Sequence, residues 1–181
     1  VFANLALPKI SGVPVVGATL TASSGTWDEP SLSYKYQWYA NGVAISGATG
    51  KTYKLRTSQL GKTISVGVTP SKEWFAPAPQ ARSASTAKVG YSSSLSVKSK
   101  AKKKRAVEFS VTVKSNKKAV RGKVRVYRGK TLIKTVSLNK KGKATIKLKK
   151  QRAGTQTYTI KYSGSGHAKP VTKTVKVKTK K

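Results

Sequence analysis

The sequence contains no cysteine and no methionine among its 181 residues. Without thiols it can form neither a disulfide framework nor a thiolate metal site. The lack of cysteine does not assign a reducing compartment, because exported proteins can also do without disulfides. The chain opens at Val1, which predicts a processed product or an excised fragment. No apolar run reaches the roughly 18 residues of a membrane-spanning helix, so none is predicted.

Acids and histidine are also scarce. The chain has four acids and one histidine, namely Asp28, Glu29, Glu73, Glu108 and His167. Asp28 and Glu29 precede a proline and are expected to form a solvated turn rather than an acid/base pair. His167 lies in a Gly-Ser loop with no acid nearby in sequence to orient its imidazole. These groups are too few for a calcium or zinc shell. We therefore expect no enzyme activity, cofactor or metal, although the chain could be an accessory region of a larger secreted enzyme.

Lysine, by contrast, is in large excess. The chain carries 38 Lys and Arg and a formal charge of +34. Of these cations, 29 follow Gly90, where Glu108 is the only acid, so this half carries +28. Such a charge requires counterions or an anionic partner. Lysine greatly outnumbers arginine there, which favours diffuse attraction over bidentate recognition of a defined phosphate or base.

The first half has the alternation of β-strands. Residues 33–40, SYKYQWYA, place aromatic side chains on one face, with Trp38 predicted in the core. Asn41 and Gly42 follow, and this dipeptide predicts a type I′ hairpin with a return strand at 43–45. Further strands are predicted at 19–22, 52–55 and 63–68. Gly, Pro and Ser separate these segments at the short intervals of a β-sandwich.

The second half shows the same period with a different composition. From Ala106 onward, Lys and Arg alternate with Val, Ile, Leu and Tyr at the two-residue period of a pleated sheet. This pattern predicts a folded cationic β surface rather than a polar tail. A Ser-rich stretch and an abrupt change in charge predict a boundary. The predicted domains are residues 1–88 and 94–181, with a linker at 89–93.

Ordered motifs resemble a known family. Residues 8–87 include PKISGVPVVGATLTASSGTW, YKYQWYANGVAISGATGKTYKL and LGKTISVGVTPSKEW. This set resembles the immunoglobulin-like repeat found in tandem on exported proteins of actinobacteria and related bacteria. The second domain more loosely resembles another bacterial immunoglobulin-like repeat, through GKVRVYRGKTLIKTVSLNKKGKATIKL and YTIKYSGSGHAKP. The resemblance implies an all-β fold of two tandem immunoglobulin-like β-sandwich domains without disulfides. It also implies non-catalytic modules of secreted or cell-surface bacterial proteins, placed beside a hydrolase domain or in stalks and adhesins.

The outward lysines of the second domain are the candidate binding residues. Lysines also solvate surfaces and protect sheet edges from aggregation. A whole cationic face is costly, because opposed like charges destabilise a sheet by up to about 1 kcal/mol per pair, and salt weakens this cost without removing it. We therefore predict one continuous outward face that binds a polyanion. The predicted polyanion-binding residues are Lys102, Lys103, Lys104, Arg105, Lys123, Arg125, Arg128, Lys143, Lys147, Lys149, Lys161, Lys176 and Lys178.

Aromatic side chains offer a second type of contact. Exposed rings beside lysines can stack on an acidic glycan or on single-stranded nucleic acid. The candidates are Trp27, Trp74 and Tyr127. Packing at the rim of the sandwich is the alternative, and it is favoured for Trp27 and Trp74.

Three hypotheses remain open from the sequence. The favoured one is a secreted or cell-surface bacterial module that binds an anionic envelope polymer, such as teichoic acid, teichuronic acid or an acidic polysaccharide. The second is sequence-independent nucleic-acid binding, which charge alone does not distinguish. The third is a passive spacer, or a subunit that self-associates in an extracellular fibre, with lysines that serve only solubility.

Overall fold

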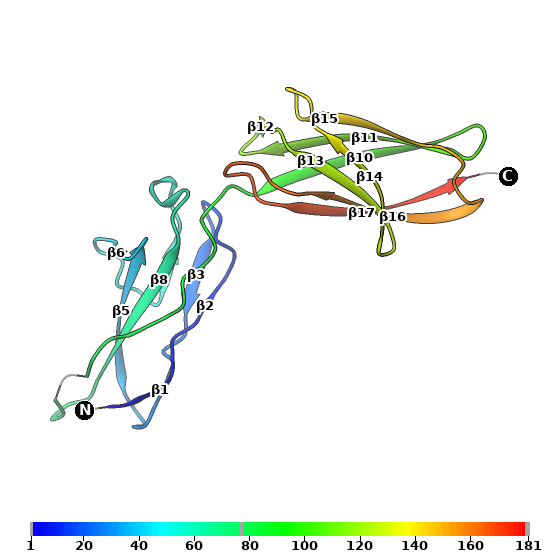
Figure 1. Ribbon diagram of the computed structural model, residues 1–181. Coiled ribbons are helices and arrows are strands. Elements are labelled where there is room, and N and C mark those ends of the chain that lie inside the picture. Colours follow the sequence, from blue (N-terminus) through cyan, green and yellow to red (C-terminus); the bar gives the residue numbers. More distant parts are fainter. Residues whose placement is uncertain (1, 77, 180–181) are drawn as a thin grey trace. The chain divides into compact units, whose positions relative to one another are not determined.

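The computed structural model describes residues 2–76 and 78–179, and the chain forms two compact units that meet between Gly90 and Tyr91 (Figure 1). In the described residues the regular structure consists of β-strands and one short 3-10 helix, η1 (Thr57–Gln59). The predicted all-β fold is therefore confirmed. No helix in the described residues is long and apolar enough to cross a membrane.

The described residues of the first unit form nine strands. They are β1 (Asn4–Ala6), β2 (Ile10–Ser11), β3 (Thr19–Ala22), β4 (Thr26–Trp27), β5 (Ser33–Ala40), β6 (Val43–Ala44), β7 (Thr52–Lys54), β8 (Ile64–Ser71) and β9 (Ala81–Arg82). They form a β2-β3-β7 sheet, a β6-β5-β8-β9 sheet and a β1-β4 pair. The predicted strands at 19–22 and 33–40 match β3 and β5.

The core of the first unit forms around Trp38 of β5. This side chain is fully buried, and its Nε1–H donates to the carbonyl oxygen of Gly50 at 2.8 Å. Its ring stacks on Tyr53 of β7 with centroids 5.9 Å apart. The predicted hairpin is present, since Asn41 and Gly42 have φ of 48° and 82° and β6 returns beside β5.

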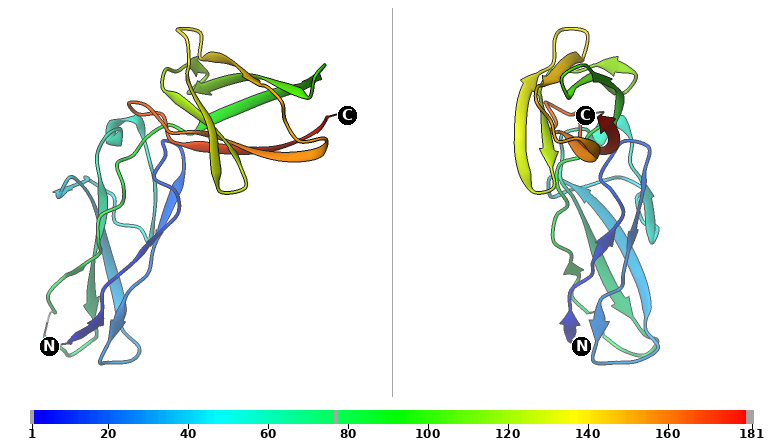
Figure 2. Two further views of the ribbon diagram at one scale, coloured as in Figure 1. Left: turned by 45° about the vertical axis from the view of Figure 1, so that its right-hand side comes forward. Right: turned by 90° about the vertical axis from the view of Figure 1, so that its right-hand side faces the viewer.

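The second unit has longer strands. They are β10 (Ser93–Lys102), β11 (Ala106–Ser115), β12 (Lys118–Ala119), β13 (Lys123–Arg128), β14 (Thr131–Ser137), β15 (Lys143–Leu148), β16 (Gly154–Tyr162) and β17 (Val171–Thr179). One antiparallel sheet contains β10, β11 and β15, with β12 beside β11, and the other has the order β14-β13-β16-β17. Figure 2 shows β10 and β11 in one layer and β16 and β17 in the other.

Alternate side chains of these strands fill the space between the two sheets. The buried cluster combines residues of β11, β13, β15 and β16, and Phe109 meets Tyr158 edge to face with centroids 5.2 Å apart. The Tyr158 hydroxyl donates to Gln151 Oε1 at 3.1 Å, and that of Tyr162 donates to the Arg121 carbonyl at 2.8 Å. Burial raises the pKa of both phenols. Both rings thus bury apolar area and still keep a hydrogen bond.

Strand β10 differs from the sequence expectation. The regular cationic pattern was predicted to begin at Ala106, yet β10 starts at Ser93 and pairs with β11 through Lys102. The segment predicted as a linker also contributes to both folds. Val89 is buried in the first unit's core, while the N–H of Tyr91 donates to the carbonyl of His167 at 2.7 Å.

Trp38 and Trp74 provide a matched test of this core. We expect Trp38→Ala to lower the free energy of unfolding by about 3–5 kcal/mol, because it leaves a cavity and an unpaired carbonyl. Trp74 is 93% exposed, so Trp74→Ala should change that energy by no more than about 0.5 kcal/mol. Calorimetric unfolding of the whole chain measures both. Equal losses in the two variants would contradict this account of the core.

Candidate anion-binding site

The outer face of β10, β11 and β15 carries an ordered set of cations. Alternation turns one set of side chains inward, where Val107 and Phe109 are buried, and turns the other set to solvent. We call this solvent side the three-strand face. It includes Lys98, Lys100, Lys102, Glu108, Ser110, Thr112, Lys143 and Lys147.

Register sets the order of the groups on the three-strand face. Lys100 pairs with Glu108, and Glu108 pairs with Lys147, so these three side chains form one row across the sheet. Neighbouring strands lie about 4.8 Å apart, which puts the lysines of β10 and β15 about 10 Å apart on either side of β11. Between them, β11 presents the hydroxyls of Ser110 and Thr112. The result is two lysine columns, with Thr145 between Lys143 and Lys147 in the column of β15. They flank a β11 column of Glu108 and two hydroxyls.

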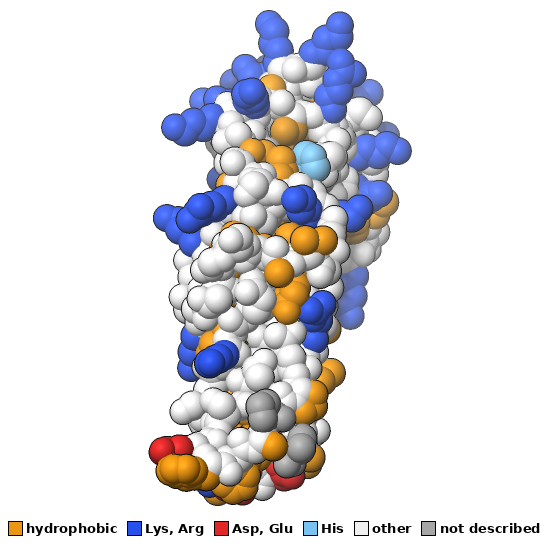
Figure 3. All heavy atoms as spheres, turned by 90° about the vertical axis from the view of Figure 1, so that its left-hand side faces the viewer, with side chains coloured by type: hydrophobic (Ala, Val, Ile, Leu, Met, Phe, Trp, Pro, Cys, Tyr) orange, Lys and Arg blue, Asp and Glu red, His pale blue; other side chains and the backbone are white. Residues whose placement is uncertain are grey.

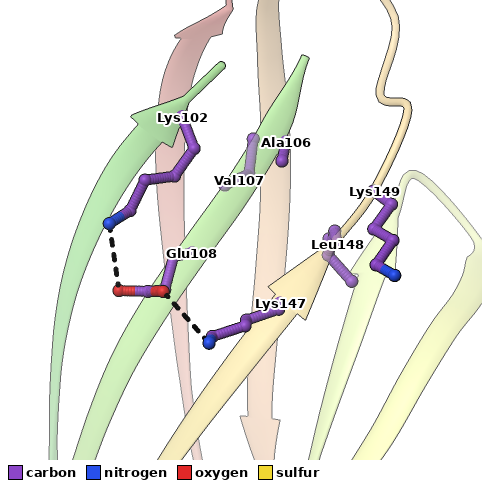
Figure 4. Close-up of a pocket in the computed structure, with 7 residues that line it drawn as sticks. All are labelled: Lys102, Ala106, Val107, Glu108, Lys147, Leu148 and Lys149. Carbon is purple, nitrogen blue, oxygen red and sulfur yellow. Dashed lines mark ion pairs between the residues drawn. The ribbon is translucent and has the colours of Figure 1, made fainter. Parts of the chain in front are cut away.

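Glu108, the only acid of the second unit, lies inside this arrangement (Figure 4). Its Oε1 is 3.8 Å from Lys102 Nζ and its Oε2 is 4.0 Å from Lys147 Nζ, while its side chain is 25% exposed. A cavity of about 300 Å³ opens beside it. The cavity is lined by Ala106, Val107, Leu148 and Lys149 together with the three charged residues of the ion pairs.

A second group of cations lies on the outer face of the other sheet. This four-strand face carries Lys123, Arg125, Tyr127, Lys161, Lys176 and Lys178. Arg125 is directly opposite Lys161, and the Lys161 ammonium lies 4.9 Å from the centre of the Tyr127 ring. That cation–π contact offsets part of the repulsion between the two charges. Toward the other end of the sheet, Lys176 and Lys178 pair with threonines of β16.

The remaining predicted cations lie at strand ends. Lys103, Lys104 and Arg105 form the turn between β10 and β11. Arg128 ends β13 and its Nη1 donates to Gln151 Oε1 at 3.4 Å, while Lys149 follows β15. The prediction of one continuous face is therefore wrong. The strands divide the cations between two opposite faces and a hairpin tip, because the period of two places them outward on both sheets.

Two cations of the three-strand face were missed from the sequence. Lys98 and Lys100 belong to β10, which resembles a polar linker because SKAKKKR has almost no apolar residues. The alternation of Leu95 and Val97 with Ser and Lys could have identified the strand. Figure 3 shows Lys and Arg side chains around the single histidine of the second unit, whereas Asp and Glu gather at one end of the first.

The three candidate aromatic contacts differ in their environments. Trp27 is only 8% exposed, packs with Phe2 and Ala78, and donates its Nε1–H to the Ser24 carbonyl at 2.9 Å. It is a core residue and offers no ring face to a ligand, which corrects its inclusion among the ligand contacts. Trp74 is 93% exposed, and Tyr127 is half-buried beneath Lys161.

Asp28 and Glu29 of the first unit have structural partners. The Asp28 carboxylate accepts the N–H of Ala3 at 2.9 Å, and Glu29 forms an ion pair with Lys72. Over residues 2–76 and 78–179, no three His, Cys, Asp or Glu side chains gather as metal ligands would.

Glu108 should stabilise the three-strand face against its own repulsion. We expect Glu108→Gln to lower the unfolding free energy by up to about 1 kcal/mol at low salt, and the loss should shrink as salt screens the lysines. Thermal unfolding over a salt series measures this loss. Lys98→Gln is the control, because removing one cation from the same face should leave the melting temperature unchanged or raise it. A higher melting temperature for Glu108→Gln at low salt would contradict the assignment.

Several solved structures show a low similarity to this chain. The fibronectin(III)-like modules of Clostridium thermocellum CbhA are 12% identical over 96% of this chain and 95% of theirs, with a TM-score of 0.38. The chicken CNTN1 FN1-FN3 domains are 15% identical over 98% of this chain and 68% of theirs, with a TM-score of 0.36. Parabacteroides merdae β-glucuronidase is 12% identical over 97% of this chain and 24% of its own, with a TM-score of 0.33.

A family model gives a clearer result. No curated protein matches the chain. The model described as "Bacterial Ig-like domain (group 3)" matches residues 83–180, which is more than half of the chain and includes all strands from β10 to β17. The resemblance predicted for the second domain is thus confirmed. The chain belongs to the bacterial Ig-like domain (group 3) family.

Proposed function

We propose that the second unit binds anionic polymers through the three-strand face, and that it thereby anchors or positions a larger protein. The expected ligands are teichoic acid, teichuronic acid or an acidic polysaccharide of the bacterial envelope, and the expected location is the cell surface or the secreted fraction. In this proposal the chain is a non-catalytic accessory module. The observation that carries the proposal is the pair of lysine columns on either side of β11.

The energetics of the sheet favour an anionic ligand. In the registers of the described strands, Arg125 and Lys161 on the four-strand face are directly opposed like charges, and such a pair costs up to about 1 kcal/mol. On the three-strand face no two lysines are directly opposed, so their repulsion acts over the longer distances along and across the face. A bound polyanion removes this cost, and the counterions condensed on the polyanion are released when it binds. The half with a charge of +28 therefore gains from binding even without a specific contact.

The three-strand face suits a linear polymer better than the four-strand face. On β10, Lys98, Lys100 and Lys102 follow one another at every second residue, about 6.7 Å apart. A chain that lies along β11 can meet both lysine columns and the hydroxyls between them. On the four-strand face Arg125 and Lys161 are adjacent, but the row of Thr159 and Thr174 separates them from Lys176 and Lys178.

The edges of the four-strand sheet do not favour growth of a fibre by strand addition. Lys134 lies on the inward side of edge strand β14, opposite Val126, and its Nζ donates to the Lys147 carbonyl at 3.1 Å. Lys173 has the same inward orientation on the other edge strand, β17, opposite Ile160. An inward charge on an edge strand opposes pairing with another chain, because pairing would bury it.

Two variants with equal charge test the location of the site. The first combines Lys98→Gln, Lys100→Gln and Lys143→Gln on the three-strand face, and the second combines Lys161→Gln, Lys176→Gln and Lys178→Gln on the four-strand face. Each loses three charges, so diffuse attraction alone predicts equal effects. We expect the first variant to lose more affinity for wall teichoic acid and to show the greater reduction in the salt slope.

The measurement is calorimetric titration with purified wall teichoic acid over a salt series. Heparin, duplex DNA and single-stranded DNA serve as comparison ligands, and cell walls stripped of acid polymers serve as the negative control. Tighter binding of DNA than of wall polymer at physiological salt would favour nucleic acid as the partner. Absence of binding to every polyanion at that salt would leave the spacer or the fibre subunit.

A further inference from the structure

Glu108 is a carboxylate at the centre of a face that otherwise attracts anions. It lies in the same row as Lys100 and Lys147, between the two lysine columns. A site for a ligand with negative groups alone gains nothing from a carboxylate at this position, because that group repels the ligand. Glu108 therefore has either a purely structural role or a ligand that carries positive groups as well as negative ones.

The ion pairs of Glu108 are long. Its oxygens lie 3.8 and 4.0 Å from the ammonium nitrogens of Lys102 and Lys147, whereas hydrogen-bonded pairs of this kind measure about 2.7–2.9 Å. The two lysines thus lower the local repulsion without occupying the carboxylate oxygens as close donors. Figure 4 shows the carboxylate between the two ammonium groups, which approach it from opposite sides. A ligand donor can therefore approach the carboxylate as a closer partner.

The adjoining cavity can hold the group that carries such a donor. It has a volume of about 300 Å³, and Ala106 contributes apolar surface on the same side of the sheet as Glu108. Val107 and Leu148 also line it, but they are only 1% and 4% exposed and belong to the core. Lys102, Lys147 and Lys149 contribute cations. One small space thus combines a hydrogen-bond acceptor with several ammonium groups, which suits a short unit that bears both signs of charge.

We propose that the anionic polymer bound by the three-strand face carries primary ammonium substituents, and that Glu108 binds them. In this arrangement the ligand ammonium donates to the Glu108 carboxylate. Lys102 and Lys147 pair with the anionic groups on either side. This inference rests on the proposed function, because it specifies the ligand class of the same site.

A comparison of two heparin derivatives tests the inference through the sign of a preference. N-desulfated heparin carries free ammonium groups, and its N-acetylated form carries neutral amides at the same positions. Bulk electrostatics predicts that a protein of charge +34 binds the ammonium form more weakly, because that polymer is less negative. Recognition by Glu108 predicts the opposite order.

We expect the native chain to bind the ammonium form about two- to fivefold more tightly than the acetylated form, the gain of one exposed ion pair. Glu108→Gln should reverse this order and should bind the acetylated form more tightly than the native chain does. Glu73→Gln makes the same charge change in the first unit, on an exposed side chain, and should keep the native preference. Isothermal titration at one fixed salt concentration measures all of these affinities, and circular dichroism verifies the fold of each variant.

The other outcomes separate this inference from the function on which it rests. If the native chain binds both derivatives but prefers the acetylated form, the ammonium inference is overturned and polyanion binding stands. The same conclusion follows if Glu108→Gln strengthens binding of both derivatives by the same factor, since Glu108 then only reduces the charge of the face. If the native chain binds neither derivative, both proposals fail.

Discussion

Repulsion among the cations that the strands hold on their outer faces is the constraint on which the second unit depends. Opposed like charges cost up to about 1 kcal/mol per pair, whereas complete burial of an aromatic or branched side chain stabilises by about 1.5–3 kcal/mol. Phe109, Tyr158 and Ile160 are buried on the inner side of the same strands that carry lysines outside. Each strand contributes both repulsion on its outer side and burial on its inner side. The fold tolerates its charge because the free energy gained by burial is the larger of the two.

This balance connects stability with the proposed function. The sheet is more stable when the repulsion between its cations is reduced, and either an internal acid or an external polyanion can reduce it. Glu108 is the internal acid, between Lys102 and Lys147, and a ligand along β11 would be the external polyanion. The two sources compete for the same lysines. A ligand that also carries ammonium groups would resolve the competition, because it gives Glu108 a partner of its own.

Periodic side chains allowed much of the fold to be predicted. The hairpin at Asn41 follows from local φ requirements, and the inward row of β11 follows from a period that does not depend on its neighbours. Strand β10 was missed because its alternation is limited to Leu95 and Val97, and its second half is almost free of apolar residues and is defined by its pairing with β11. Trp27 was ambiguous for a similar reason. Its burial depends on Phe2 and Ala78, which are distant in sequence.

By itself, the sequence determined the all-β class and the concentration of charge in one half. It also determined on which side of each predicted strand a lysine lies. Composition and a two-residue period are local properties, so they can be read without knowing the fold. Only the tertiary structure decided which strands are neighbours. The row of Lys100, Glu108 and Lys147 joins β10, β11 and β15, and nothing within one strand specifies that register. Pairing between distant segments depends on the packing of the shared core, which also divided the lysines between two faces.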